Sequence, residues 1–434
     1  MIYPTRTAVI AAAAGVPVAL AFAAAQPGRW YLAVAWPLSI VLLTLADALK
    51  SAAAATASVD LPGHAYVGET RDCTVTVRVP SRPRSVSVAL DDSPLVEAED
   101  DGRAKFPLDE GAGAVLLPLA MMRRGIARIE HVWVRWTGPL GLAWRQDRIA
   151  VDGSFPILPD LRPVHDQGAH IFDRYALDGL IAQRSRGEGS DFDALVDFRT
   201  GMDRRSIDWK QSARHVKLLA KQYKTERNNQ ILFAIDTGRQ MCEPVAGIAR
   251  VDRCVSAMLL TAWIALKLGD RAAINAFDSR PRLSSGFVSG AGAFTELERI
   301  AADIDYSTEE TNFTFALTTL AAKLTRRSMI VLFTEFTDTV SADFMLRALR
   351  RLVEKHLVMI VVLRDEELET LVDAEPREAD DVTRAVTAGE LLAERRLVIS
   401  RLVHLGVHVV ESEYDKVSER LVQSYLDLKK RNLL

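Results

Sequence analysis

The stretch that decides the fold is Ile231-Leu-Phe-Ala-Ile-Asp236, five consecutive apolar residues that end at a carboxylate. Continuous rather than alternating apolarity is typical of a central parallel strand, buried on both faces. We expect further strands of the same sheet at 271–277, 329–333, 357–363 and 407–410. Between them, apolar residues at helical spacing predict helices at 249–268, 294–302, 313–324, 342–354, 383–402 and 416–430. This alternation predicts a doubly wound α/β domain over residues 228–434.

Upstream of this domain the period of the sequence changes to two. Apolar and polar residues alternate in Cys73–Val79, Ser85–Leu90 and Arg128–Trp136, and proline and glycine separate these runs. Short alternating strands with frequent turns are typical of a β-sandwich. We therefore expect a small β-sandwich at 57–159, and a segment at 160–227 that joins it to the α/β domain.

The first fifty residues contain two apolar runs. Ala8–Ala25 carries no charge, and Trp30–Leu49 carries only Asp47. About 20 helical residues cross a bilayer, and both runs are close to that length. A cleaved signal peptide is the alternative, but the second run would then stop transfer of the chain. We expect a two-helix transmembrane hairpin at 1–50.

Basic residues predict the orientation of this hairpin. Arg6 and Lys50 flank it on one side, whereas only Arg29 lies in the turn. Basic residues favour the cytoplasmic side of a membrane. The sequence therefore predicts a protein of the inner (cytoplasmic) membrane, with its folded domains in the cytoplasm.

Composition excludes several classes of protein. The 434 residues have a net charge of −3, so no field of the whole chain attracts nucleic acid. The three cysteines fit neither a disulfide framework nor a zinc site. No nucleophile elbow occurs, and we expect Cys242 to be a packing residue. We expect neither an enzyme nor a receptor for a small-molecule substrate.

Oxygen-bearing side chains gather where the predicted strands end. Asp236 and Glu335 end two strands, and Thr311 precedes a helix between them. In parallel sheets such positions share one edge, where ligands bind. Hard cations such as Mg²⁺ take oxygen ligands from several loops. The full candidate set is Asp236, Thr237, Thr311, Thr334, Glu335 and Asp338.

This set resembles the metal-ion-dependent adhesion site of von Willebrand factor A domains. The first motif of that site is Asp-x-Ser-x-Ser, followed later by a Thr and an Asp. Here Asp236 and Thr311 match, Gly238 and Gln240 replace both serines, and Glu335 stands in the place of the later Asp. The resemblance implies a von Willebrand factor A-like domain. Two readings of its site stay open, a weak Mg²⁺ site and a degenerate site that binds no metal.

The densest polar segment runs from Gly187 to Arg227 and includes Ile207-Asp-Trp-Lys-Gln-Ser-Ala-Arg214. It resembles the signature of the bacterial proteins grouped as domain of unknown function family 58. The residues that we single out as signature or interaction residues are Asp191, Asp193, Asp203, Arg205, Asp208, Trp209, Lys210 and Arg214. The chain departs from the family pattern at Val196, Phe198 and Met202, where Arg, Tyr and Asp are usual.

Two roles are open for this segment. Its basic side chains could bind Asp191 and Asp193 and clamp the two domains together, with Trp209 anchored in a groove between them. Alternatively it forms a polar surface that binds phosphate or the carboxylates of a partner.

The family resemblance also implies a partner, since relatives often work beside MoxR-type AAA+ ATPases. We therefore expect a non-enzymatic adaptor or scaffold in the assembly or maturation of other proteins. One alternative is a divalent-metal hydrolase that uses Asp236, Glu335 and the Asp191/Asp193 pair. The other is a nucleic-acid-binding protein that uses the basic segment 199–227.

Overall fold

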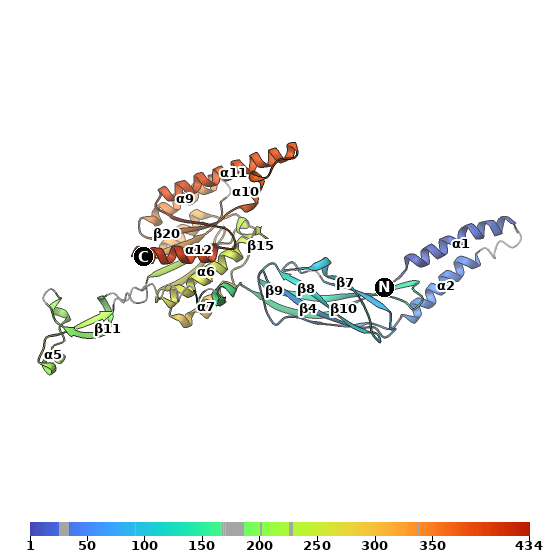
Figure 1. Ribbon diagram of the computed structural model, residues 1–434, viewed down its shortest axis with the longest axis horizontal. Coiled ribbons are helices and arrows are strands. Elements are labelled where there is room, and N and C mark those ends of the chain that lie inside the picture. The colour runs from blue at the N-terminus through green and yellow to red at the C-terminus, as the bar shows by residue number, and fades with distance from the viewer. Residues whose placement is uncertain are drawn as a thin grey trace. The chain divides into compact units, whose positions relative to one another are not determined.

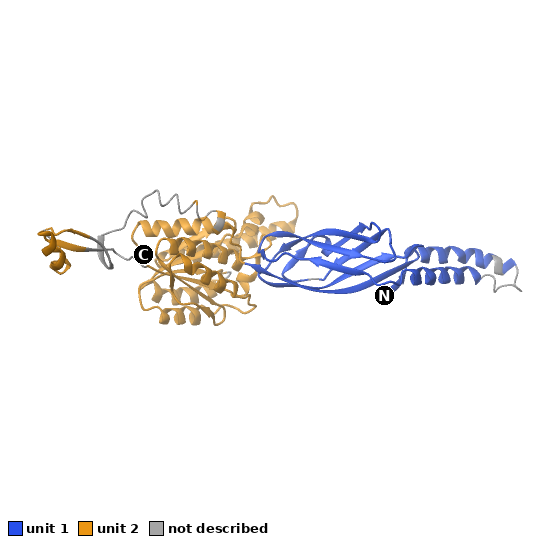
Figure 2. Cartoon of the chain, turned by 90° about the horizontal axis from the view of Figure 1, so that it is seen from below, with its two compact units in different colours: residues 1–158 blue, residues 159–434 orange. Residues whose placement is uncertain are grey.

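The structure is a computed structural model, and it describes residues 1–25, 34–91, 93–166, 168, 170, 186–199, 202–224, 229–336 and 339–434. The chain divides into two compact units, Met1–Leu158 and Pro159–Leu434, which Figure 2 colours separately. Each unit is described by itself.

Unit 1 contains two β-sheets. One has the order β1-β10-β9-β5-β7, with β3 beside β10, and the other has the order β2-β4-β8-β6. Their strands are β1 (Ile2–Pro4), β2 (Thr56–Asp60), β3 (Ala65–Tyr66), β4 (Thr70–Arg78), β5 (Ser85–Leu90), β6 (Val96–Ala98), β7 (Arg103–Pro107), β8 (Ala112–Met121), β9 (Gly125–Thr137) and β10 (Ala143–Leu158).

The core of unit 1 follows the period-two pattern of the sequence. On β4 the side chains of Cys73, Val75 and Val77 are fully buried, while the residues between them are not. Burial raises the pKa of the Cys73 thiol to about 11. On β9 the fully buried Trp136 continues the same alternation. The three strands predicted from alternation are therefore confirmed, with β5 matched to the residue.

Two helices, α1 (Arg6–Ala25) and α2 (Ala35–Lys50), precede the sandwich strands. In the described residues of the chain, no helix is long and apolar enough to cross a membrane. The predicted transmembrane hairpin is therefore wrong. The physical reason lies partly at the ends of the segment, because both ends are built into the β-structure of unit 1.

Before α1, β1 pairs antiparallel with β10, with Tyr3 opposite Trp144. Near the end of α2, the Asp47 carboxylate accepts hydrogen bonds from the backbone N–H groups of Leu140, Leu142 and Ala143 at 2.7–3.0 Å. Asp47 is fully buried. The one charged residue of the second apolar run thus accepts the backbone hydrogen bonds of a turn in the β-sandwich.

Unit 2 is built on a seven-stranded sheet of order β17-β16-β13-β19-β20-β21, with β18 beside β16. The strands from β16 to β21 in this order are parallel, and β17 and β18 are antiparallel to β16. The strands are β13 (Gln230–Asp236), β16 (Arg271–Phe277), β17 (Pro281–Ser284), β18 (Val288–Ser289), β19 (Met329–Phe333), β20 (Leu357–Leu363) and β21 (His408–Ser412). A separate short hairpin pairs β14 (Pro244–Val245) with β15 (Ile248–Ala249).

Helices pack on this sheet, as Figure 1 shows. They are α6 (Arg250–Lys267), α7 (Phe294–Ala302), α8 (Phe313–Lys323), α9 (Thr339–Val353), α11 (Ala379–His404) and α12 (Val417–Lys430). Of the other helices, α3 (Arg162–Asp166) packs against α6, and α10 (Glu366–Asp373) packs against α11. One buried cluster joins side chains of α8, α9 and α11 to alternate residues of the central strands, such as Leu232, Ile330 and Ile360. The predicted parallel sheet is present, and its strands 271–277, 329–333 and 357–363 are matched to the residue.

One helix of unit 2, α10, is not among the helices predicted from the sequence. It begins within the acidic run Asp365–Glu369. The Asp365 side chain accepts a hydrogen bond from the Leu368 N–H and caps this helix. Acidic residues in a first helical turn interact favourably with the helix dipole, so the run favours a helix start.

The signature segment forms a small sheet of its own, in which β11 (Arg186–Asp197) pairs with β12 (Leu219–Lys224). Between them lie a short 3-10 helix, η3 (Arg204–Ser206), and α5 (Trp209–His215). We call residues 202–224 the basic arm.

Candidate functional site

Asp236 ends β13 and is buried at the carboxyl edge of the sheet. Its Oδ1 accepts hydrogen bonds from the Thr311 hydroxyl at 2.6 Å and from the Gly238 N–H at 2.9 Å. Its Oδ2 accepts from the Thr334 hydroxyl at 2.7 Å. Burial raises the pKa of Asp236 to about 6, although these three donors favour the charged form. The predicted neighbours Thr311 and Thr334 thus do meet Asp236.

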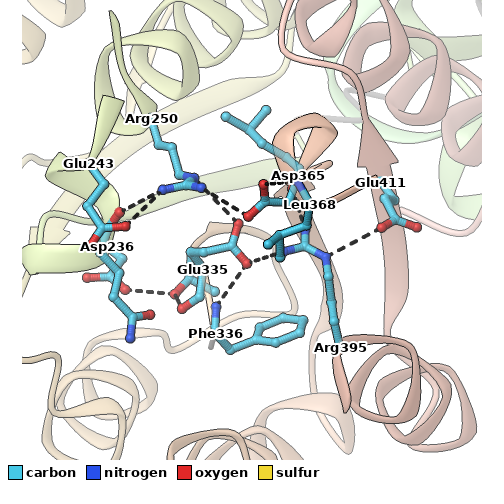
Figure 3. Close-up of polar contacts among 12 residues, drawn as sticks. Asp236, Glu243, Arg250, Glu335, Phe336, Asp365, Leu368, Arg395 and Glu411 are labelled. Carbon is cyan, nitrogen blue, oxygen red and sulfur yellow. Dashed lines mark hydrogen bonds and ion pairs between the residues drawn. The ribbon is translucent and has the colours of Figure 1, made fainter. Parts of the chain in front are cut away.

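Glu335 follows β19 and is also buried, but its carboxylate is held by arginines. Arg395 Nη1 lies 2.6 Å from Glu335 Oε1, and Arg250 Nε lies 3.9 Å from Oε2 (Figure 3). The Phe336 N–H also donates to Oε1 at 3.1 Å. Burial raises the pKa of Glu335, and the charges of Arg395 and Arg250 oppose that rise.

Both arginines hold further groups at this edge. Arg250, the first residue of α6, lies 3.3 Å from Glu243 and 3.5 Å from Asp365. Arg395, in α11, lies 3.6 Å from Glu411 and donates to the Leu363 carbonyl. Figure 3 shows the two guanidinium groups on either side of Glu335. We call Glu335, Arg250, Arg395 and their carboxylate partners the edge network.

These residues do not fit a divalent cation. The Thr311 and Thr334 hydroxyls donate to Asp236, and the Thr237 hydroxyl donates to the Phe277 carbonyl at 3.1 Å. A Cβ atom built on Gly238 would overlap the Thr311 hydroxyl, so no motif serine fits there without a shift. The Glu335 carboxylate is already paired with the guanidinium groups of Arg250 and Arg395. The arrangement supports the degenerate-site reading, and Asp338 lies outside the described residues.

Of the groups proposed for hydrolysis, the structure describes the side chains of Asp236 and Glu335, which lie at the carboxyl edge of the sheet. Asp191 and Asp193 belong to β11, in the separate small sheet, and their side chains are outside the described set. The Cys242 thiol contacts the Thr237 carbonyl at 3.4 Å, as expected of a packing residue.

A second group of possible ligands lies in unit 1, and the sequence analysis did not single it out. Within the described residues, Asp91, Glu130 and His131 have ligand atoms within 4.8 Å of one another. Arg148 Nη2 also lies 3.0 Å from His131 Nδ1. A guanidinium at this distance disfavours a cation at the same place.

The aspartates of the basic arm cap local helices. Asp203 accepts from the Arg205 N–H at 2.9 Å. Asp208 accepts from the N–H groups of Lys210 and Gln211 at 3.0 and 3.1 Å, and it pairs with Lys221 at 3.4 Å. The bond from the Gln211 N–H is the main cause that lowers the pKa of Asp208. These contacts explain why Asp208 precedes the helix.

The clamp prediction pairs basic side chains with Asp191 and Asp193, whose side chains lie outside the described residues, so it stays a prediction. Trp209 is 69% exposed among the described residues, and its predicted place in a groove between the domains stays a prediction. Among the described residues, Arg205, Lys210 and Arg214 form no ion pair. Their side chains project from a segment whose own carboxylates are already used in capping.

A family model described as "Protein of unknown function DUF58" matches residues 196–389. This part of the chain is a DUF58 domain. The DUF58 match begins inside β11 and ends inside α11, so it includes the basic arm, Asp236 and Glu335. Arg395 and Glu411 lie beyond its end.

No curated protein matches this chain. Among solved structures, BatB from Bacteroides thetaiotaomicron matches at 11% identity, covering 46% of this chain and 99% of BatB, with a TM-score of 0.29. Proximal thread matrix protein 1 of the mussel byssus matches at 12% identity, 47% and 45% coverage and a TM-score of 0.26. The RO protein of Deinococcus radiodurans matches at 16% identity, 38% and 35% coverage and a TM-score of 0.19. At these TM-scores the similarities carry no argument.

Proposed function

We propose that this protein is a non-enzymatic adaptor or scaffold that works with a MoxR-type AAA+ ATPase in the assembly or maturation of other proteins. The observation that carries the proposal is the edge network. At the sheet edge where ligands of parallel sheets bind, Asp236 and Glu335 are held by the protein's own hydroxyl and guanidinium groups. These buried groups fix the edge, where Glu243 and Glu411 of the same network expose their carboxylates, and such an edge suits recognition of a partner.

In this proposal the α/β domain is of the von Willebrand factor A type, with arginine in place of the metal ion. Support comes from the position of the groups, because Asp236, Thr311 and Glu335 come from the loops that correspond to the adhesion site. Arg250 and Arg395 supply the positive charge that an ion would bring.

The location belongs to the same proposal. The chain would act at the inner membrane, with both units on the cytoplasmic side, where ATP is available to the ATPase. Cell fractionation followed by protease treatment of spheroplasts tests this location. Protection of both units in intact spheroplasts is the expected result, and digestion from outside would overturn it.

The adaptor role is tested with purified proteins. The full chain is added to the MoxR-type ATPase, and binding and the rate of ATP hydrolysis are measured with and without a chelator added to the adaptor beforehand. We expect a complex, and a changed ATPase rate, that do not depend on this pretreatment. Hydrolysis of phosphate or peptide esters by the chain alone, abolished by the chelator, would favour the hydrolase instead.

A further inference from the structure

The basic arm exposes large apolar side chains. Trp209, which begins α5, is 69% exposed, and Val216, which ends it, is 91% exposed. Leu218 is 51% exposed. Seven helical positions correspond to a rise of about 10 Å, so the side chains of Trp209 and Val216 form two separate apolar contact sites. Tryptophan dominates the energetics of many protein interfaces, where it fills a desolvated pocket of the partner.

The backbone at Val216 is a second, independent observation. Its φ of 52° and ψ of 32° lie in the left-handed region, which favours glycine and is unusual for a β-branched residue. Glycine would end the helix with less strain, and the exposed valine side chain adds little to the packing of the arm. Strain of this kind is retained where a side chain serves a function.

The charge of the arm indicates what it binds. Residues 202–224 contain two acidic side chains, Asp203 and Asp208, and both accept local backbone hydrogen bonds. The same residues contain seven basic side chains, Arg204, Arg205, Lys210, Arg214, Lys217, Lys221 and Lys224. Among the side chains that the structure describes, which do not include that of Lys224, only Lys221 of this set has an ion-pair partner. Residues 202–224 therefore carry a net charge of +5 (seven basic minus two acidic side chains), while β11, which pairs with β12, adds the acidic residues Glu188, Asp191, Asp193 and Asp197.

We propose that residues 202–224 dock on an acidic surface of a partner protein, with Trp209 in an apolar pocket and the neighbouring basic side chains paired with carboxylates. The identity of the partner as the ATPase rests on the proposed function, whereas the docking itself does not. Two exposed aliphatic side chains, Val216 and Leu218, favour protein over single-stranded nucleic acid, which binds to stacked aromatic platforms.

Photo-crosslinking identifies the molecule that contacts the arm. The full chain carries Trp209→benzoylphenylalanine and is irradiated in cells, and the crosslinked peptide is sequenced by mass spectrometry. Control chains carry the same photoreactive residue at Phe344, an aromatic residue of α9 that is also about half exposed. We expect position 209, but not position 344, to crosslink to one protein. The crosslinked peptide should belong to an acidic surface of that protein.

The same partner is then purified and its affinity for the full chain is measured. Trp209→Ala and the pair Arg204→Glu/Arg205→Glu should each weaken binding roughly 10- to 100-fold. Phe344→Ala and the pair Arg350→Glu/Arg351→Glu, on α9, should leave the affinity within about twofold. The melting temperature of each variant should match the wild type, which separates loss of contact from loss of folding.

The outcomes separate this inference from the proposed function. An acidic protein other than the ATPase supports the docking arm and overturns the proposed partner. An ATPase that binds all variants equally keeps the proposed function and overturns the docking arm. Nucleic acid at position 209, or no crosslink specific to that position, also overturns the docking arm.

Discussion

Arg395 Nη1 lies 2.6 Å from Glu335 Oε1, with both side chains almost completely buried. Removing one member of a buried ion pair leaves an uncompensated charge and typically costs about 3–5 kcal/mol. Arg250, at 3.9 Å, compensates only part of that charge. We expect Arg395→Met to destabilise unit 2 by about 3 kcal/mol in calorimetry of the full chain.

Two controls accompany this variant. Arg401→Ala removes an exposed pair with Asp343 and should cost less than about 1 kcal/mol. Glu335→Gln combined with Arg395→Met removes both charges and should recover part of the loss. Equal effects of the buried and exposed arginine variants would show that the edge network does not stabilise the fold.

Asp236 gives unit 2 a pH dependence with a defined sign. Its pKa is raised from 3.8 to about 6, so between these values the native state binds a proton that the unfolded state has released. The contribution of Asp236 to stability therefore increases as pH falls from 7 through 6 towards 4. About two pKa units correspond to roughly 3 kcal/mol at most.

The comparison variant is Asp236→Asn, which lacks this titration. We expect the unfolding free energy of the wild type, relative to that of the variant, to increase by about 2–3 kcal/mol when the pH is lowered from 7 to 4. Urea titrations at several pH values measure this difference. Parallel pH profiles would show that Asp236 has an ordinary pKa.

Restoring the motif serine should not restore a metal site. A Cβ at Gly238 would overlap the Thr311 hydroxyl, so Gly238→Ser should lower the melting temperature of unit 2. Adding Thr311→Ala makes room and should recover part of the loss. Calorimetric titration should show weak Mg²⁺ binding or none for the wild type and for Gly238→Ser. Tight binding to the wild type, abolished by Asp236→Ala, would contradict the degenerate-site reading.

Asp47 should be important for the stability of unit 1. Its carboxylate accepts from three backbone N–H groups, and each buried donor left without an acceptor costs about 1–3 kcal/mol. We expect Asp47→Ala to destabilise unit 1 by about 2 kcal/mol or more, measured as the shift of its thermal transition. Asp72→Ala, at an exposed position of β4, is the matched control and should change little. Similar shifts for both variants would contradict this role.

Much of unit 2 was predictable because its strands are continuous apolar runs that end at polar residues. The strands at 271–277, 329–333 and 357–363 match the predictions to the residue for this reason. Asp236 and Thr311 were also paired correctly, since strand order places both at one edge. The strand ends therefore carry most of the information about the candidate site.

The arginines of the edge network were not predictable. A buried Glu335 requires a cation, but the chain has 54 lysines and arginines, and no spacing distinguishes Arg250 or Arg395 from the rest. Arg395 lies 60 residues from Glu335 in sequence, and only the packing of α11 brings them together. Hydropathy misled at Asp47, which is the one charge of an apolar run predicted to cross a membrane but instead accepts backbone hydrogen bonds in unit 1.

The pairing of β1 with β10 has a consequence for biosynthesis. The first residues of the chain take their place at the edge of the sheet only after β10, which ends at Leu158, has been made. Until then β1 has no partner strand among the described elements. Once Leu158 has left the ribosome, every strand of unit 1 is available and its sheets can close while unit 2 is still being translated. A ribosome stalled shortly before β10 would hold a nascent chain with its N-terminal strand unpaired, which is the point in synthesis where a chaperone would be needed most.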